Sequence, residues 1–290
     1  MSGTALRHAT VIGDALIDEW QDGDGTAEAV GGAALNVAAG LRVLGIDARL
    51  VAMVGDDADG AAVRAHLEAQ GVPLIATAAP NGTARATSVR VAGEPSYVFN
   101  EAAMRRRVEL DDVALGDDLV VVSCVAFDDA RQARAIAEVP APEGRLVIDP
   151  NPRPGMLNDR DAFRAGFLAA AARALLVKVS DEDAAVLGFT DLDALVGALR
   201  ASGTRLVLAT EGPRGASLHG DGFTASAPVT VRADAVVDTM GAGDATLATV
   251  VAGLAAGEPA DAAGWQALLE RAMAVAGATC TAYGAQLRLP

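Results

Sequence analysis

Short apolar runs rich in β-branched residues alternate with longer segments of helical periodicity, and this alternation constrains the fold more than any other feature of the sequence. The runs expected to form strands are 9–13, 49–54, 119–123, 145–149, 174–179 and 205–209. The segments expected to form helices are 33–44, 58–70, 129–138, 160–173, 191–201, 243–256 and 261–279. This order predicts an α/β fold with a mainly parallel sheet covered by helices on both faces. Ligands of such folds bind beyond the carboxyl ends of the strands, so the loops there are where a site is expected.

Two segments break the alternation. Residues 86–100 alternate polar and apolar side chains around Gly93-Glu94-Pro95, which predicts a β-hairpin with its turn at these three residues. Residues 14–28 read as a second extended excursion before the first helix. A length of 290 residues favours one large domain, 1–290, and we expect 14–30 and 86–101 to form a small β-lid inserted in it.

Charge and composition exclude several classes of partner. The net charge is −15 and aromatic residues make up only 3% of the chain, which argues against nucleic acid and against an anionic membrane surface. No apolar run reaches the roughly 18 residues of a membrane span, and no signal peptide is recognisable, so we expect a soluble, cytoplasmic protein. Cys124 and Cys280 lie far apart and outside any C-x-x-C pair, which favours two buried thiols over a zinc site or a disulfide.

Basic residues narrow the choice of nucleotide site. Lys178 is the single lysine, and it sits in an apolar run rather than in a Gly-Lys-Ser/Thr loop, which excludes a P-loop. The run Arg105-Arg106-Arg107 is interpreted as a solvated basic patch.

The most specific motif is Asp238-Thr239-Met240-Gly241-Ala242-Gly243-Asp244, followed by an apolar helix. Small residues let a backbone approach a ligand closely, and the first amides of a helix have no internal partners. Such a turn binds an anion such as a phosphoryl group, and Asp244 at its mouth can accept a proton from an attacking hydroxyl. Two other interpretations stay open. A dinucleotide fingerprint would need a glycine where Thr246 stands. An ordinary helix start would use an aspartate as N-cap.

Three weaker blocks lie at other expected strand ends. Gly31-Gly32-Ala33-Ala34-Leu35-Asn36 enters a helix, and the polar Asn36 in an apolar context suggests a side chain aimed at a hydrogen-bonding group. Asp149-Pro150-Asn151-Pro152-Arg153 follows a strand and suits contact with hydroxyls or phosphates, although turn chemistry would also explain it. Thr210–Gly215 is either a nucleotide-contacting turn or an ordinary hairpin turn.

Taken together and in this order, the four blocks resemble the ribokinase-like (PfkB) carbohydrate kinase family, from about Val11 to Ala285. The resemblance implies a three-layer α/β/α fold with a small β-strand lid. It also implies ATP-dependent phosphorylation of a hydroxymethyl group on a small sugar. Asp244 is then the general base, and the amides of Gly241, Ala242 and Gly243 form the anion hole for the transferred phosphoryl group.

The resemblance also assigns the binding residues. Those expected at the sugar are Asp18, Gly32, Asn36, Phe99, Asn151 and Arg153. Those expected at the nucleotide are Lys178, Ser180, Thr210, Gly212, Gly215 and Gly243. ATP and Mg²⁺ are the implied cofactors, with K⁺ as a candidate monovalent cation. A homodimer through the lid is a candidate assembly, because a two-stranded lid is marginal by itself.

Two departures from the family pattern bear on the site. Where the family has N-x-x-E, this chain has Ser180 and Asp183, and Asp183 is the candidate metal-associated carboxylate. Where ketodeoxygluconate kinases show Tyr-Arg, this chain has Phe99-Asn100, which weakens an acidic-sugar assignment, although Arg105 could compensate.

The acceptor stays open at this point. The block at 149–153 favours a fructose-like ketose. A nucleoside, ketodeoxygluconate or phosphosugar kinase of the same family is the alternative, and Trp20, Tyr97 and Phe99 would either stack on a nucleoside or pack the lid. A regulator that binds sugar or nucleotide with weakened turnover is a further alternative, motivated by the altered segment 180–183.

Overall fold

The computed structural model describes residues 8–22, 25–91, 94–111, 113–115, 119–141 and 144–290. Within these residues a nine-stranded sheet has the order β13-β12-β11-β10-β9-β8-β1-β4-β5. Its strands are β1 (His8–Gly13), β4 (Asp47–Met53), β5 (Leu74–Thr77), β8 (Leu119–Ser123), β9 (Leu146–Asp149), β10 (Leu176–Ser180), β11 (Leu206–Thr210), β12 (Ala216–Gly220) and β13 (Phe223–Ala227). All neighbours are parallel except β11–β12 and β12–β13. The mainly parallel sheet that the sequence predicts is therefore confirmed.

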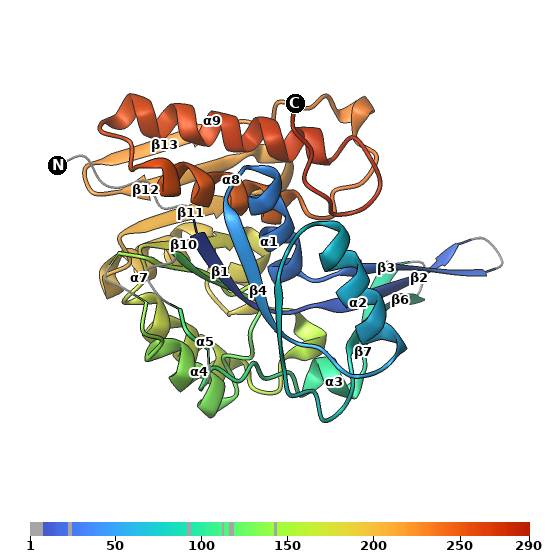
Figure 1. The fold of residues 1–290 in the computed structure, drawn as a ribbon. Coiled ribbons are helices and arrows are strands. Elements are labelled where there is room, and N and C mark those ends of the chain that lie inside the picture. The colour runs from blue at the N-terminus through green and yellow to red at the C-terminus, as the bar shows by residue number, and fades with distance from the viewer. Residues whose placement is uncertain (1–7, 23–24, 92–93, 112, 116–118, 142–143) are drawn as a thin grey trace.

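Helices cover both faces of this sheet (Figure 1). One layer holds α1 (Ala33–Val43), α8 (Ala242–Ala256) and α9 (Ala262–Thr279), and the opposite layer holds α4 (Ala130–Ala137), α5 (Arg160–Ala171) and α7 (Leu192–Ser202). Each layer packs its own apolar core against the sheet. The central strands are buried on both sides, and Val120, Val121 and Val122 are each 0% exposed, which explains why they read as continuous apolar runs rather than as alternating ones.

Aspartate N-caps fix where several of these helices begin. The side chains of Asp57, Asp129, Asp159, Asp191 and Asp261 each accept a hydrogen bond from an amide of the first helical turn. Such a cap contributes about 1 kcal/mol to helix stability, because it satisfies an amide that the helix itself leaves free. The acidic composition of the chain is thus partly used to set helix boundaries. The helix that Asp57 caps is α2 (Ala58–Ala69).

A second, four-stranded sheet projects from the body of the molecule (Figure 1). Its order is β3-β2-β6-β7, formed by β2 (Leu16–Asp22), β3 (Gly25–Gly31), β6 (Ala84–Val91) and β7 (Glu94–Phe99). The small β-structure that the sequence predicts is confirmed, with both excursions folded as hairpins. The predicted turn is displaced, because Glu94 and Pro95 belong to strand β7, and Gly93 lies outside the described residues.

One arginine ties the small sheet to the body. Arg85 on β6 forms ion pairs with Asp59 at the start of α2 (2.7 Å), Glu19 on β2 (2.7 Å) and Glu28 on β3 (2.5 Å). Asp59 and Glu28 raise the pKa of Arg85, and the three ion pairs of its guanidinium link β6 to α2, β2 and β3.

Several short elements were not predicted from the sequence. They are β5, β12, β13, α3 (Glu101–Met104), α6 (Asp181–Val186) and the 3₁₀ turns η1 (Pro154–Met156), η2 (Gly212–Arg214) and η3 (Ala233–Ala235). The strands among them lie at the two ends of the large sheet and are only partly buried, so they lack the continuous apolar runs of the central strands, and the helical turns are too short to show a period.

Candidate active site

The polar side chains singled out in the sequence gather where β1, β9, β10 and β11 end and where α1 and α8 begin. The two helices start from glycines and pack against each other, while the small sheet continues from the end of β1. This is the edge of the sheet at which α/β folds bind ligands.

The turn into α8 needs a glycine at its N-cap. Gly241 has φ +76°, and a Cβ at this position would lie 2.5 Å from the carbonyl oxygen of Ala285. Ala242, Gly243 and Asp244 form the first helical turn, and the amide of Ala242 donates to the carbonyl of Thr239 at 3.3 Å. Asp238 steadies the loop by accepting the amides of Met240 and Gly284, each at 3.0 Å. The alternative that an aspartate is the N-cap is wrong, because Gly241 occupies that position.

Asp244 is held from the neighbouring helix. Asn36 of α1 donates through Nδ2 to Asp244 Oδ2 at 2.8 Å. Burial raises the pKa of the Asp244 carboxyl, while this hydrogen bond and the positive charges of Lys178 and Arg153 act in the opposite direction. A partly desolvated carboxylate with a fixed orientation is suited to accept a proton from a bound hydroxyl.

Two carboxylates follow β1. Asp14 accepts the amide of Ala34 at 2.9 Å at the start of α1, a helix whose N-cap is Gly32 with φ +116°. Asp18 lies on β2, and a Cβ on Gly31 would be 2.2 Å from its Oδ2, so the glycine leaves the room that this side chain fills. Burial, with the negative charges of Asp14 and Asp244, raises the pKa of Asp18 to about 6, against the effect of Arg153.

The single lysine of the chain is buried in this site. Lys178 Nζ lies 3.2 Å from Asp149 Oδ1 and 3.4 Å from Asp149 Oδ2, which joins the ends of β10 and β9. A Cβ on Gly243 would be 3.4 Å from the same nitrogen, so Lys178 reaches the turn into α8. Burial lowers the pKa of Lys178, but the carboxylates of Asp149, Asp183 and Asp244 outweigh it and raise the pKa overall.

The loop after β9 approaches the same centre. Asn151 is buried with φ +39°, and its carbonyl accepts the thiol of Cys124 at 3.7 Å. The positive charge of Arg153 lowers the pKa of four carboxyl groups of the site, those of Asp14, Asp18, Asp149 and Asp244. Phe99 of β7 lies against Gly155 of this loop, where a Cβ would be 2.8 Å from the ring.

The expected nucleotide residues lie on the adjacent strand ends. Ser180 is the N-cap of α6 and forms a capping box with Asp183, in which Ser180 N donates to Asp183 Oδ2 at 2.7 Å. Thr210 ends β11, and its hydroxyl donates to the carbonyl of Val179 at 3.4 Å. The segment 210–215 joins two antiparallel strands, so it is also the hairpin turn that the sequence left open. Gly212 and Gly215 have φ +52° and +99°.

Metal binding by protein side chains alone is not evident at these strand ends. Within the described ranges, no group of three His, Cys, Asp or Glu side chains is arranged to hold a metal ion. The carboxylate of Asp183 nevertheless offers a hard oxygen donor of the kind that Mg²⁺ prefers, and Mg²⁺ commonly completes its shell with water and substrate phosphates. The donor chemistry therefore fits Mg²⁺ shared with a bound nucleotide.

Among the described helices, none combines the length and the hydropathy that a membrane span requires.

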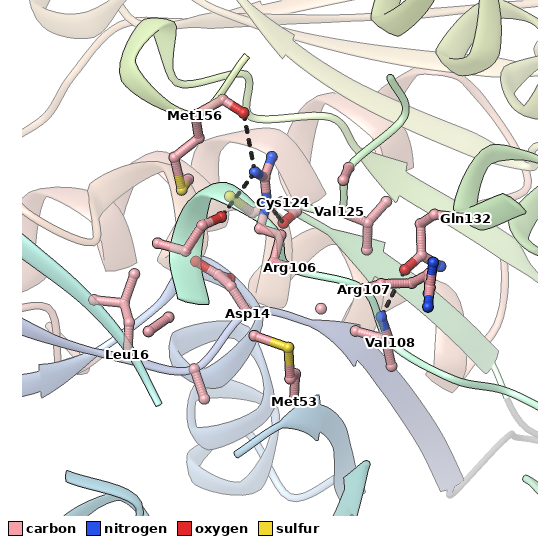
Figure 2. A pocket seen from close by; sticks show the side chains of 15 residues that line it. Asp14, Leu16, Met53, Arg106, Arg107, Val108, Cys124, Val125, Gln132 and Met156 are labelled. Atoms are coloured by element: carbon pink, nitrogen blue, oxygen red, sulfur yellow. Dashed lines mark hydrogen bonds between the residues drawn. The ribbon is translucent and has the colours of Figure 1, made fainter. Parts of the chain in front are cut away.

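Sequence reasoning missed three residues near the site. Asp14 carries a usable signal, since it directly follows the first strand at Gly13. Cys124 has φ +54° at the end of β8, which no sequence pattern indicates. The prediction that Arg106 belongs to a solvated patch is wrong. Its side chain is buried and donates to the carbonyls of Cys124, Ala103 and Met156 (Figure 2). Arg105 and Arg107 on either side pair with the surface acids Glu101 and Glu109.

Comparison with known proteins places the chain among carbohydrate kinases. The model of the pfkB family of carbohydrate kinases matches residues 7–290. A fructokinase of Rhizobium leguminosarum bv. trifolii is 33% identical over 243 residues, which are 79% of this chain and 73% of that protein. A fructokinase of Klebsiella pneumoniae is 30% identical over 295 residues, or 97% of this chain and 95% of that protein.

A solved structure extends the comparison to the fold. The aminoimidazole riboside kinase of Salmonella enterica, in complex with aminoimidazole riboside and an ATP analogue, superposes with a TM-score of 0.78. It is 25% identical to this chain, and the match covers 96% of this chain and 95% of that one.

Proposed function

The chain belongs to the pfkB family and is an ATP-dependent carbohydrate kinase, and we propose that its acceptor is a fructose-like ketose phosphorylated on a primary hydroxyl. Two fructokinases at 33% and 30% identity support a ketose acceptor. The observation that carries the proposed chemistry is the hydrogen bond from Asn36 to Asp244, because it orients one carboxylate beside the turn into α8.

We propose the following roles in the transfer step. Asp18, Gly32 and Asn36 bind the sugar hydroxyls, and Asn151 and Arg153 close the other side of the acceptor. Asp244 takes the proton from the hydroxyl that attacks the γ-phosphorus of ATP. Phosphoryl transfer needs positioning and charge neutralisation more than covalent help, and the proposed site supplies both.

Neutralisation has to be local in a chain whose net charge is −15. The amides of Gly241, Ala242 and Gly243 form the proposed anion hole, with the helix dipole of α8 behind them, and the Ala242 amide would exchange its 3.3 Å bond to the carbonyl of Thr239 for the phosphoryl group. Lys178 lies against Gly243 and brings a buried positive charge to the same turn. Arg153 adds a second positive charge on the acceptor side.

The nucleotide would lie over the ends of β10 and β11. Ser180, Thr210, Gly212 and Gly215 line this part of the proposed site. Mg²⁺ is the proposed divalent ion, held by phosphate oxygens and water with Asp183 nearby; when bound, it neutralises charge on the phosphates. Asp183 already uses Oδ2 in its capping box, so its contact with the ion would go through its other oxygen or through water.

K⁺ is proposed as an activating ion, and omitting it from a Mg²⁺-containing assay tests this.

The small sheet is the proposed lid over the acceptor. Closure would exclude water, which otherwise competes with the sugar hydroxyl. Its exposed apolar side chains, Trp20, Tyr97 and Val98, also make it the proposed contact in a homodimer.

A nucleoside is the second candidate acceptor. The structural similarity to an aminoimidazole riboside kinase favours it, as does the stacking of Tyr97 on Phe99 with ring centroids 6.4 Å apart. An aromatic pair at the edge of the site could stack on a base.

A turnover panel decides between these acceptors. ADP release is measured with ATP and Mg²⁺ against ketoses, aldoses, nucleosides, ketodeoxygluconate and phosphosugars. We expect D-fructose to give the highest kcat/KM, with Asp244→Asn as a control for contaminating kinases. Faster turnover of a nucleoside would replace the ketose by the second candidate. Binding without turnover across the panel would show a regulator instead of a kinase.

A further inference from the structure

A cavity lies next to the proposed acceptor site. It opens between the residues that follow β1, the residues that follow β8, helix α3 and the 3₁₀ turn η1 (Figure 2). The walls are mainly apolar and include Leu16 and Met53, while the charged and amide residues that line it are Asp14, Arg106, Arg107 and Gln132. Its volume of about 20 Å³ has room for roughly one water-sized group.

Two buried donors on this cavity have no partner among the described residues. Arg106 is 7% exposed, and although Nε and Nη1 donate to three carbonyls, Nη2 makes no hydrogen bond. Gln132 is 1% exposed, and its Oε1 accepts the amide of Val108 at 2.6 Å while Nε2 makes no hydrogen bond. An unsatisfied buried donor costs about 1–3 kcal/mol, so two of them on one cavity point to an oxygen-bearing ligand.

The cavity and the acceptor site share a wall. Asp14 lines the cavity beside Arg106, whose positive charge lowers the pKa of Asp14, and the charge of Asp14 raises the pKa of Asp18 and Asp244 on the acceptor side. Cys124 makes a second link, because its carbonyl accepts Arg106 Nε at 3.3 Å and its thiol contacts the carbonyl of Asn151. Asp14 and Cys124 therefore lie between the cavity and the proposed acceptor site.

We propose that the cavity receives a neutral hydroxyl group of the acceptor sugar, away from the hydroxyl that is phosphorylated, and that Arg106 and Gln132 are specificity-determining residues that donate to it. The proposal rests on the sugar kinase function proposed above. A hydroxyl fits because it accepts from Arg106 or Gln132 and donates to Asp14.

Monodeoxy sugars test this proposal on the intact enzyme. The fastest acceptor of the turnover panel is compared with its analogues that each lack one non-transferred hydroxyl. With the wild-type chain, we expect one analogue to lose about 10- to 100-fold in kcat/KM, as expected when a buried donor is left unpaired. Gln132→Glu retains the acceptor for the Val108 amide and removes the donor, and Arg106→Lys retains the charge and removes the guanidinium.

In both variants, we expect the penalty for that one analogue to shrink to within about 3-fold, with the KM for ATP unchanged and the penalties for the other analogues retained. Arg105→Met, an exposed neighbour paired with Glu101, is the matched control and should retain the wild-type pattern. Melting temperatures identify any variant that fails to fold. If folded variants keep the wild-type penalty for every analogue, the proposal is overturned. Failure of the wild-type chain to phosphorylate any sugar would overturn the proposed function first, and it would appear before any variant is compared.

Discussion

Asn36 and Asp244 are 208 positions apart in the chain, and the side-chain amide nitrogen of Asn36 lies 2.8 Å from a carboxylate oxygen of Asp244. The bond connects the first turns of α1 and α8, two helices that pack side by side (Figure 1). Neither motif could orient the carboxylate alone. The packing of two helices that both start from glycines brings the pair together.

Replacement of Asn36 by leucine tests what this bond does to Asp244. The bond lowers the pKa of Asp244 against the effect of burial, so its loss should raise that pKa further. We expect the acid limb of the kcat/KM profile to move to higher pH and activity at pH 7 to fall about 10-fold or more. Asn81→Ala, in an exposed turn, is the control and should leave the profile unchanged. An Asn36→Leu profile that overlays that of the wild type would show that the bond does not tune the carboxylate.

Asp18→Asn should stabilise the free protein at neutral pH while it weakens sugar binding. The folded-state pKa of about 6 lies above the ordinary value of 3.8, so ionisation of Asp18 opposes folding once the pH exceeds these values. The predicted gain is about 1–3 kcal/mol at pH 8 and fades as the pH falls toward 4. Urea unfolding of both chains at several pH values measures it. A gain that is the same at pH 4 and pH 8 would contradict the proposed electrostatic cause.

Lys178→Met should be strongly destabilising, because it leaves Asp149 and Asp183 buried without their cation. Loss of one partner of a buried pair costs about 3–5 kcal/mol. The double variant with Asp149→Leu should recover part of this loss, since the uncompensated charge is removed as well. Urea unfolding compares the two. Equal stabilities of the single and double variants would mean that the pair is not coupled.

Gly241→Ala separates backbone strain from a steric clash. A Cβ there would meet the carbonyl of Ala285 at 2.5 Å, whereas a Cβ on Gly45, which has φ +85°, would meet nothing within 4 Å. Both substitutions incur about 1–2 kcal/mol of left-handed strain. Only Gly241→Ala should also displace the turn into α8, with a fall in kcat that Gly45→Ala does not show. A similar kcat for the two variants would show that the turn tolerates displacement.

The sequence predicts the layers of the fold well, because apolar runs and the periodicity of long segments show which residues are buried. The strand around Val121 and the helix around Phe167 are examples in which every buried face was visible as a run or a period. It also indicated the site motifs, since Asn36 stands out in an apolar segment and Gly241 belongs to a turn of small residues between two aspartates. Short strands near the ends of the sheet such as β12 escaped, because they are only partly buried and lack a continuous apolar run.

Burial of single charged residues was the main failure. Nothing in Arg105-Arg106-Arg107 distinguishes the middle residue, yet the carbonyls of Cys124 and Met156 from distant segments, together with that of nearby Ala103, bind the Arg106 side chain and bury it. The pairing of Lys178 with Asp149 likewise depends on the adjacency of β9 and β10, which only the strand order reveals. These features are properties of the assembled sheet rather than of any local segment.

The central proposal is that the Asp244 carboxylate deprotonates the attacking sugar hydroxyl. The most direct measurement is kcat for Asp244→Asn with the fastest acceptor, alongside calorimetric binding of that sugar and of ATP. Asparagine retains the shape of the side chain but has no basic oxygen, so the account predicts a loss of about 10²–10⁴ in kcat with both dissociation constants within about 3-fold of wild type. Turnover close to that of the wild type would contradict it.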